Sequence, residues 1–247
     1  MASRIVSLLL DDASSGTSPA STSDTAGDVG SFAIDFNSGS WTSIAAGNGL
    51  NLLAAAGECE AAISGTVLDA NFGDFFTYEW VGSWNSGDAS LAVQIEGTGG
   101  YYCVITGSFV RFYDNADTFI AAANHGGLTT GVYCFQVAWD SNQGTVTDRI
   151  KFWIDGVSFT CVDVAIPAQG TDLDFTSATN CRIGSNKNGS GDCYNVGLYS
   201  TVLTNTEASD NATALLADND ADPNGGAPAP EVVVIEHVST LSFPGLC

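Results

Sequence analysis

The sequence predicts an all-β protein: an antiparallel sandwich of two β-sheets with one short helix near its C-terminal end. Short runs of β-branched and aromatic residues recur along the chain, and several alternate between apolar and polar residues, as half-buried strands do. Turn residues separate these runs, and 28 glycines against 6 prolines indicate many tight turns. The 247 residues, 45% of them hydrophobic, are enough for one large domain with a buried core.

The N-terminal part is expected to hold three strands. Residues 1–10 form the first, and its run from Ile5 to Leu10 is apolar enough to be covered on both faces. A loop rich in Ser, Thr, Gly and Ala follows at 11–30. SFAIDF at 31–36 alternates strictly and predicts a strand, and NGLNLLA at 48–54 predicts another.

The centre of the chain carries the strongest strand signals. FFTYEWVGSW at 75–84 is the clearest of them. Further strands are expected at residues 89–96, 101–105, 108–113, 131–139, 149–154, 157–164, 181–184 and 194–199. Asp155-Gly156 is typical of a two-residue hairpin turn and joins two of these strands.

One helix is expected before the C-terminal end. Thr204 or Thr206 can cap its first turn, and residues 208–217 are rich in Ala and Leu. Residues 218–230, DNDADPNGGAPAP, have the composition of an acidic Pro/Gly linker, and EVVVIEHV at 231–238 predicts a last strand. The sequence therefore divides into a sandwich domain at 1–217, the linker at 218–230 and a C-terminal arm at 231–247. The apolar strand of this arm needs a cover, and we expect the arm to contact neighbouring subunits.

The charge balance excludes one class of partner. Only 6 Lys or Arg stand against 28 Asp or Glu, a formal net charge of -22. Such a charge repels phosphates, so no direct nucleic-acid binding is expected. It suits a basic partner, bound cations or solubility in a saline medium. No segment approaches a membrane span, and the apolar run after Arg4 is shorter than a signal-peptide core. We therefore expect synthesis in a cytoplasm.

The seven cysteines show no CxxC pair, so a zinc site has little support. Cys103 and Cys134 lie within predicted strands, where a thiol packs as a small apolar group. Reduced and buried thiols are the expected state. If one pair is bridged, Cys181 and Cys193 are the candidates, because they flank one loop.

Two long segments resemble the laminin-G-like, or concanavalin-A-like, family. VAWDSNQGTVTDRIKFWIDGVSF at 137–159 is similar to that family's strand, loop, strand, DG turn and strand. RIGSNKNGSGDCYNVGLYSTVLTNTEASDNATALL at 182–216 resembles its closing pattern, and FFTYEWVGSW resembles an early core strand. The resemblance implies a jelly-roll sandwich. It leaves function open, because lectins, glycanases, adhesion modules and virion proteins share this fold.

Catalytic residues are not evident. Glycanases need two positioned carboxylates, and the nearest pattern is Glu58-Cys59-Glu60, without the intervening acid that such enzymes of this fold carry. His125 and His237 are the two histidines, and no GxSxG motif accompanies them. We therefore expect no enzyme activity.

Two candidate ligand sites remain. Asp218, Asp220, Asp222 and Asn224 place oxygen atoms at alternate positions and form a calcium candidate, although Pro223 stands where an EF-hand loop has Gly. Calcium is the one cofactor that the sequence suggests, and a solvated acidic linker is the alternative. Trp41 and Trp84 border predicted loops and are candidates for stacking on a sugar, with packing in the core or at its rim as the favoured alternative. By contrast, the tryptophans inside strands are expected in the core: Trp80, Trp139 and Trp153.

Two functions fit these observations. The first is a non-catalytic structural protein of a virus (phage) particle, such as a capsid decoration, fibre or adhesin subunit. It would assemble in the host cytoplasm and contact copies of itself and other virion proteins. The acidic charge, the odd cysteine count and the missing signal peptide and catalytic set lead to this expectation. The alternative is an extracellular carbohydrate-binding or adhesion module, with or without calcium, whose partners are surface glycans.

Overall fold

The structure is a computed structural model, and it describes much of the chain between residues 4 and 217. The described backbone comprises residues 4–9, 21–23, 31–36, 40–44, 47–52, 59–62, 74–84, 91–98, 101–114, 118–163, 165–171, 177–183 and 191–217. Side chains are described for Arg4 and within residues 74–84, 103–114, 118–162, 165–171 and 193–217. The predicted linker at 218–230 and arm at 231–247 lie outside these ranges, so the division of the chain into domain, linker and arm stays a prediction.

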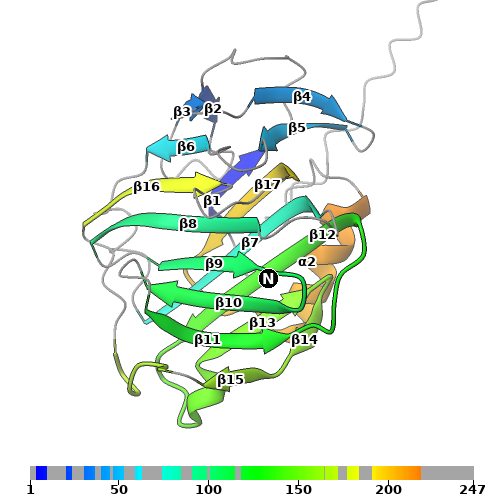
Figure 1. The fold of residues 1–247 in the computed structure, drawn as a ribbon. Helices are drawn as coiled ribbons and strands as arrows, with labels where there is room; N and C mark the ends of the chain where they lie inside the picture. Colours follow the sequence, from blue (N-terminus) through cyan, green and yellow to red (C-terminus); the bar gives the residue numbers. More distant parts are fainter. Residues whose placement is uncertain are drawn as a thin grey trace, which may run out of the picture.

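The described residues form a sandwich of two antiparallel sheets, which confirms the predicted fold class (Figure 1). The eight-stranded sheet has the order β14 (Val157–Phe159), β13 (Ile150–Ile154), β12 (Gly131–Asp140), β7 (Phe75–Trp84), β17 (Gly191–Tyr199), β5 (Gly47–Leu52) and β4 (Ser40–Ile44), and β1 (Arg4–Leu9) also pairs with β17. The nine-stranded sheet has the order β15 (Cys161–Asp163), β11 (Phe119–Asn124), β10 (Phe109–Asp114), β9 (Tyr101–Ile105), β8 (Leu91–Thr98), β16 (Ser177–Ile183), β6 (Cys59–Ala62), β3 (Ser31–Phe36) and β2 (Ser21–Ser23). In Figure 1 the strands of the nine-stranded sheet cross in front of the eight-stranded sheet, whose strands run diagonally behind them.

Strands β7 and β12 form the centre of the eight-stranded sheet. They pair over ten residues, from Gly131 opposite Trp84 to Asp140 opposite Phe75. Because side chains alternate between the two faces of a strand, residues 76, 78 and 80 share one face of β7 and residues 77, 79 and 81 share the other. Both faces of β7 are buried, the first against the other sheet and the second under a helix. The face toward the other sheet is aromatic, whereas the face under the helix carries polar residues such as Thr77 and Glu79.

The main core lies between the two sheets. Its large side chains are aromatic, and the rings of Trp80 and Phe135 stack with centroids 5.2 Å apart. The predicted burial of Trp80, Trp139 and Trp153 is confirmed. Trp153 differs from the other two, because it packs in a second cluster on the outer face of the eight-stranded sheet.

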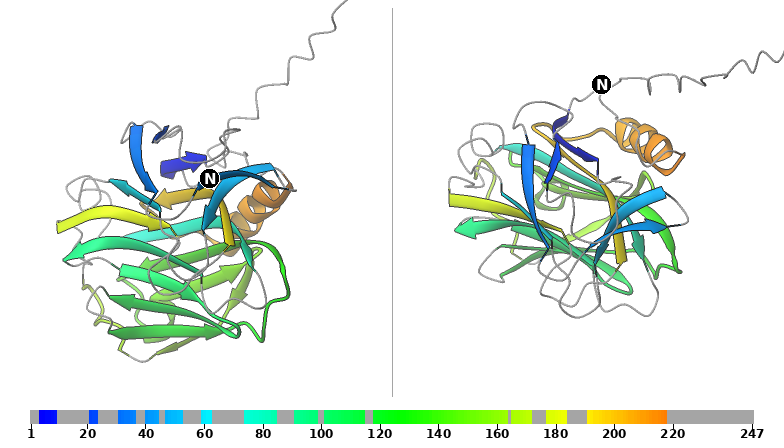
Figure 2. Two further views of the ribbon diagram at one scale, coloured as in Figure 1. Left: turned by 45° about the horizontal axis from the view of Figure 1, so that its top comes forward. Right: turned by 90° about the horizontal axis from the view of Figure 1, so that it is seen from above.

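Helix α2 (Asn205–Ala217) confirms the predicted helix and covers that outer face (Figure 2). Its cap is Thr204 rather than Thr206. The Thr204 hydroxyl accepts a hydrogen bond from the Glu207 N–H at 3.2 Å, and the Glu207 carboxylate accepts one from the Thr204 N–H at 3.0 Å. This reciprocal pair is a capping box, which fixes the first turn of the helix. Among the described residues, no helix is long and apolar enough to cross a membrane.

The structure differs from the predicted strands in two ways. Strands β2, β4, β6 and β11 lie where no strand was expected from the sequence, and three of them are no longer than five residues. The predicted strand at 157–164 is divided at Thr160 into β14 and β15, which belong to different sheets. The chain crosses from one sheet to the other at Thr160. Apolar residues lie on both sides of this crossing, so in the sequence the two short strands look like one continuous strand.

The turn Asp155-Gly156 generates a stability prediction. Gly156 has a φ of 73°, and a Cβ atom there would lie 2.4 Å from the Cα of Ser209 in α2. Gly170 has a φ of 75° with no atom near its would-be Cβ. Backbone strain alone costs about 1–3 kcal/mol. We expect Gly156→Ala to lower the free energy of unfolding, measured in urea, by more than Gly170→Ala does, because only Gly156 also collides with helix backbone. Equal losses for the two variants would contradict this close approach.

Candidate functional site

The structure corrects the expectation for Trp84. Its side chain is 1% exposed and belongs to the core between the sheets, so it presents no face to a sugar. Trp84 lies an even number of residues from Trp80 on β7, which places both on the same face of the strand. Trp41 lies on β4, whose side chains are outside the described part of the chain, and its role as a stacking residue stays a prediction.

The calcium candidates Asp218, Asp220, Asp222 and Asn224 lie outside the described residues, so calcium binding there stays a prediction. Within the described residues, no group of three or more His, Cys, Asp or Glu side chains is arranged to hold a metal ion. Of the pair Glu58 and Glu60, the first is outside the described ranges and the second lies on β6 without a described side chain.

The cysteines follow the expected state where they are described. Cys103 and Cys134 are buried thiols, and burial raises the pKa of both above the ordinary value of a thiol. A thiol with a raised pKa stays protonated and is a weak nucleophile at neutral pH. Cys193 is a buried thiol whose Sγ lies 4.0 Å from the carbonyl oxygen of Asn195, whereas the side chain of its candidate bridge partner Cys181 lies outside the described residues.

His125 supports a loop after β11 rather than a catalytic centre. Its Nδ1 accepts a hydrogen bond from the Gly127 N–H at 3.2 Å, so the ring proton resides on Nε2 and is donated to the Thr106 carbonyl at 3.0 Å. Gly126 and Gly127 adopt positive φ values of 78° and 112°, which bring the loop back over the ring. His237 lies outside the described residues.

A pocket of about 200 Å³ opens at the edge of the sandwich, where the chain leaves β14 for β15. We call it the rim pocket. Two of the residues that line it carry charges, Asp148 from the 3-10 helix η1 (Val146–Asp148) and Lys151 from β13. Its polar lining residues are Thr147, Asp148, Lys151, Ser158, Thr160 and Asn205. Phe159, which is half-buried, and the buried Phe152 and Trp153 add aromatic lining.

Asn205, the first residue of α2, has a fixed amide orientation in this pocket. Its Oδ1 accepts a hydrogen bond from Trp153 Nε1 at 3.0 Å. Since an indole N–H can only donate, the oxygen of the amide is directed to Trp153, and the NH₂ group remains for a ligand. The pocket therefore combines an ammonium and an amide as donors, a carboxylate as acceptor, and three hydroxyl groups that can do both.

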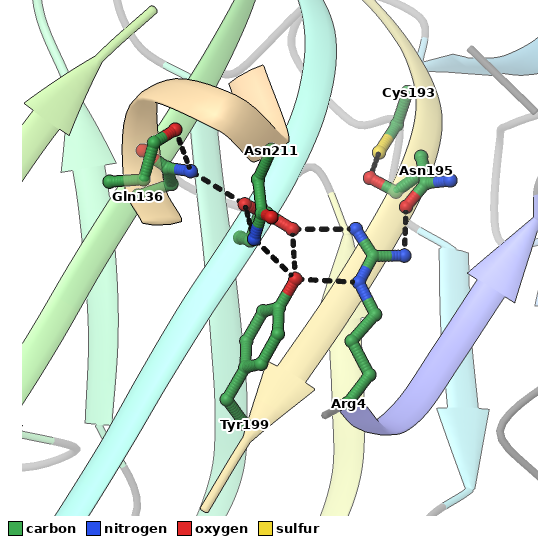
Figure 3. Close-up of polar contacts among 8 residues, drawn as sticks. Arg4, Gln136, Cys193, Asn195, Tyr199 and Asn211 are labelled. Carbon is green, nitrogen blue, oxygen red and sulfur yellow. Dashed lines mark hydrogen bonds and ion pairs between the residues drawn. The ribbon is translucent and has the colours of Figure 1, made fainter. Parts of the chain in front are cut away.

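A second polar cluster lies beneath α2 and is closed to solvent (Figure 3). Its centre is an ion pair between Arg4 on β1 and Glu79 on β7, with N and O atoms 2.7 Å apart and both side chains 0% exposed. Glu79 also accepts hydrogen bonds from Tyr199 at 2.6 Å, Gln136 at 2.5 Å and Asn211 at 3.2 Å. Four strands and the helix are thus joined at one carboxylate.

The Arg4 side chain has its own set of partners. It donates to Asn195 Oδ1 at 2.7 Å and to the Tyr199 hydroxyl at 3.1 Å. Gly197 makes room for it, since a Cβ atom at that position would lie 2.2 Å from Arg4 Nε. Burial by itself lowers the pKa of Arg4, but neighbouring Tyr199 and Glu79 outweigh it, and the net shift is upward. Burial also raises the pKa of Tyr199, so its hydroxyl keeps the proton that it donates to Glu79. The cluster is a structural clamp without access for a ligand.

Comparisons with known proteins find similar folds among solved structures. No family model matches the sequence, and no curated protein is significantly similar to it. Among solved structures, the binding domain of botulinum neurotoxin serotype D/C VPI 5993 is similar with a TM-score of 0.62 and 11% identity, over 86% of this chain and 52% of that chain. Domain 4 of AbnA, a GH43 extracellular arabinanase from Geobacillus stearothermophilus in complex with arabinotriose, gives a TM-score of 0.55 and 14% identity, over 85% and 98%. Trypanosoma rangeli sialidase in complex with the inhibitor DANA gives 0.54 and 16%, over 87% and 33%.

These similarities show that the chain shares a two-sheet β-sandwich fold with these structures. The chain spans about half the length of the neurotoxin binding domains and a third of the sialidase, whereas it spans nearly all of the arabinanase domain. At 11–16% identity the likeness shows the shared fold and not a shared ligand.

The sequence revealed neither the rim pocket nor the buried clamp. The pocket residues come from η1, β13, the crossing at Thr160 and the start of α2, which the sequence separates by up to 58 positions, from 147 to 205. Arg4 and Glu79 are 75 positions apart. A usable signal was present at Glu79, the one charged residue in a strand with strong aromatic content, because a buried charge requires a partner.

The clamp generates a stability prediction. Arg4→Met leaves the buried carboxylate of Glu79 without its counter-charge, and breaking a buried pair in this way costs about 3–5 kcal/mol. We expect this loss in the free energy of unfolding, measured by urea denaturation, and expect the double variant Arg4→Met, Glu79→Gln to recover part of it. Arg111→Met, which removes a partly exposed cation on β10, is the control and should cost less than about 1 kcal/mol. A loss for Arg4→Met no larger than that of the control would contradict the clamp.

His125 generates a pH prediction. Burial lowers its pKa in the folded protein below the unfolded value. The unfolded chain therefore takes up a proton first as the pH falls, so the stability contributed by neutral His125 is present above about pH 6.5 and is lost as the pH falls through the folded-state pKa. Nuclear magnetic resonance of the imidazole should show the Nε2–H tautomer at pH 7 and a pKa below 6.5. A charged ring at pH 7 would contradict the Gly127 hydrogen bond.

Proposed function

We propose that the protein is a non-catalytic carbohydrate-binding module and that the rim pocket binds the sugar. The observation that carries the proposal is the lining of this pocket, in which Asp148, Lys151 and the Asn205 amide meet three hydroxyl groups and a half-buried aromatic side chain. Small-molecule sites combine apolar and aromatic walls with a few convergent polar groups, and this pocket has that composition.

The chemistry of a sugar matches these groups. Each sugar hydroxyl both donates and accepts hydrogen bonds, so it can donate to a carboxylate and accept from an ammonium or amide. Hydrogen bonds to charged groups are the stronger ones, which makes Asp148 and Lys151 the expected anchors. The C–H face of a sugar ring is apolar and can pack against an aromatic side chain such as Phe159. Asn205 is held in place by Trp153, so it loses little freedom on binding.

The same lining supports a binding role without catalysis. Glycoside hydrolysis ordinarily uses two carboxyl groups on either side of the scissile bond. Asp148 is the one acid among the residues that line the rim pocket. The pocket also contains no histidine, and its one thiol, Cys161, is buried.

The comparisons support the binding role at the level of fold. The arabinanase domain that this chain covers almost completely was solved with arabinotriose, and a similar botulinum neurotoxin type C structure concerns interaction with two ganglioside molecules. None of the similar structures named above is a virion protein. The particle role expected from the sequence therefore stays a prediction, and the function that the described residues support best is the second one.

Substitutions in the pocket test the proposal. A screen on an array of neutral and acidic oligosaccharides comes first, followed by titration calorimetry of the bound sugar with wild type, Asp148→Asn and Lys151→Met. Losing one charge-assisted hydrogen bond costs about 1.5–3 kcal/mol, so each variant should bind at least tenfold more weakly. Asp210→Asn on the exposed side of α2 and Arg111→Met on β10 remove the same charges outside the pocket and should bind like wild type.

Two outcomes would count against the proposal. One is a folded protein that binds no oligosaccharide on the array at millimolar concentration. The other is sugar binding that Asp148→Asn and Lys151→Met leave unchanged, which would place the site elsewhere on the molecule.

A further inference from the structure

Resting on the proposed function, we infer that the rim pocket takes the terminal residue of a neutral glycan, and neither an acidic sugar nor the interior of a chain. Its size and its balance of charges lead to this inference independently of each other.

The size of the pocket restricts the ligand to one sugar ring. Its volume is about 200 Å³. This volume is less than the roughly 300 Å³ at which pockets for drug-sized ligands begin. A single ring with its hydroxyl groups fits such a space, and an interior unit would bring two further rings with it. The end of a glycan is therefore the part that enters.

The residues that line the pocket come from several secondary-structure elements. Asp148 comes from η1, Lys151 from β13, Ser158 from β14 and Asn205 from the start of α2. Because these groups converge on one space rather than following one strand, they suit the hydroxyl groups of one ring better than a row of successive rings.

The charges of the pocket balance within it. Asp148 and Lys151 each line the pocket, and neither side chain has an ion pair or hydrogen bond within the described part of the chain. One acceptor and one cationic donor therefore remain for the ligand. A neutral sugar satisfies both, since one hydroxyl can donate to Asp148 while another accepts from Lys151.

An acidic sugar meets an unfavourable field. The chain has a net charge of -22, and a carboxylate or sulfate on the ligand would stand close to Asp148 in the same pocket. Two of the six basic residues are directed inward: Arg4 pairs with Glu79, and Arg149 donates to the backbone carbonyls of Gln143 and Pro167. Lys151 is the one cation that lines the pocket. A hydroxyl of a neutral sugar can accept a hydrogen bond from Lys151 without bringing a second negative charge next to Asp148.

The test uses the full chain and two series of defined probes. The first series is an arabinan, a β-glucan and a β-galactan oligosaccharide, each as a methyl monosaccharide, a disaccharide and a tetrasaccharide. The second contains the same disaccharides with the terminal unit capped by sialic acid or by sulfate. Affinities come from titration calorimetry, and circular dichroism confirms that each variant is folded.

For the glycan that binds, we expect the affinities of the methyl monosaccharide and the tetrasaccharide to differ by less than about threefold. We expect a cap of sialic acid or sulfate on the terminal unit to weaken binding at least tenfold. Asp148→Asn should reduce this difference between capped and uncapped probes, whereas the matched control Asp210→Asn should leave it unchanged. An affinity that rises tenfold or more from one sugar to four, or tighter binding of the capped probes, overturns the inference while leaving a carbohydrate-binding function in place. Binding of no probe in either series overturns the inference and the proposed function together.

Discussion

The buried pair of Arg4 and Glu79 is the interaction on which the arrangement of the outer layer depends. Moving two charges out of water is costly, and the cost is offset only when their remaining donors and acceptors also find partners. Here Tyr199, Gln136, Asn195 and Asn211 provide them. Since the pair itself lies on β1 and β7 and these partners lie on β12, β17 and α2, the pair can be satisfied in one arrangement of the strands and the helix. The apolar clusters on either side of the clamp lack this directional requirement.

The placement of α2 connects the clamp to the rim pocket. Asn211 bonds to Glu79 and Tyr199 in the middle of the helix, and the same helix begins at Asn205, whose amide lines the pocket. Trp153 and Tyr199 belong to one apolar cluster beneath this first turn, and Trp153 holds the Asn205 amide. A shift of α2 that loosened the clamp would therefore also displace the Asn205 amide in the rim pocket, although the clamp itself has no contact with solvent.

The sequence predicts those features of the structure that depend on residues close together in the chain. Alternation along β7 and the Asp155-Gly156 turn are local signals, and strands β7, β12 and β13 and helix α2 follow from such signals. The same alternation from Trp80 to Trp84 indicates a core residue, so the choice of Trp84 as a stacking candidate gave too much weight to its place at a strand end. The clamp and the rim pocket are products of distant contacts. A lone arginine before an apolar strand gives no hint of a carboxylate 75 positions away.

The position of the pocket follows from the topology of the sandwich. The space between the sheets is filled by a core whose largest members are aromatic, and the outer face of the eight-stranded sheet is covered by α2. Space for a ligand arises instead where the regular layers end. Residues 157–163 pass from the edge of one sheet to the edge of the other, with Thr160 between β14 and β15. Ser158, Phe159, Thr160 and Cys161 from this crossing all line the rim pocket. The candidate site therefore includes the break between β14 and β15, which the sequence shows only as one apolar run.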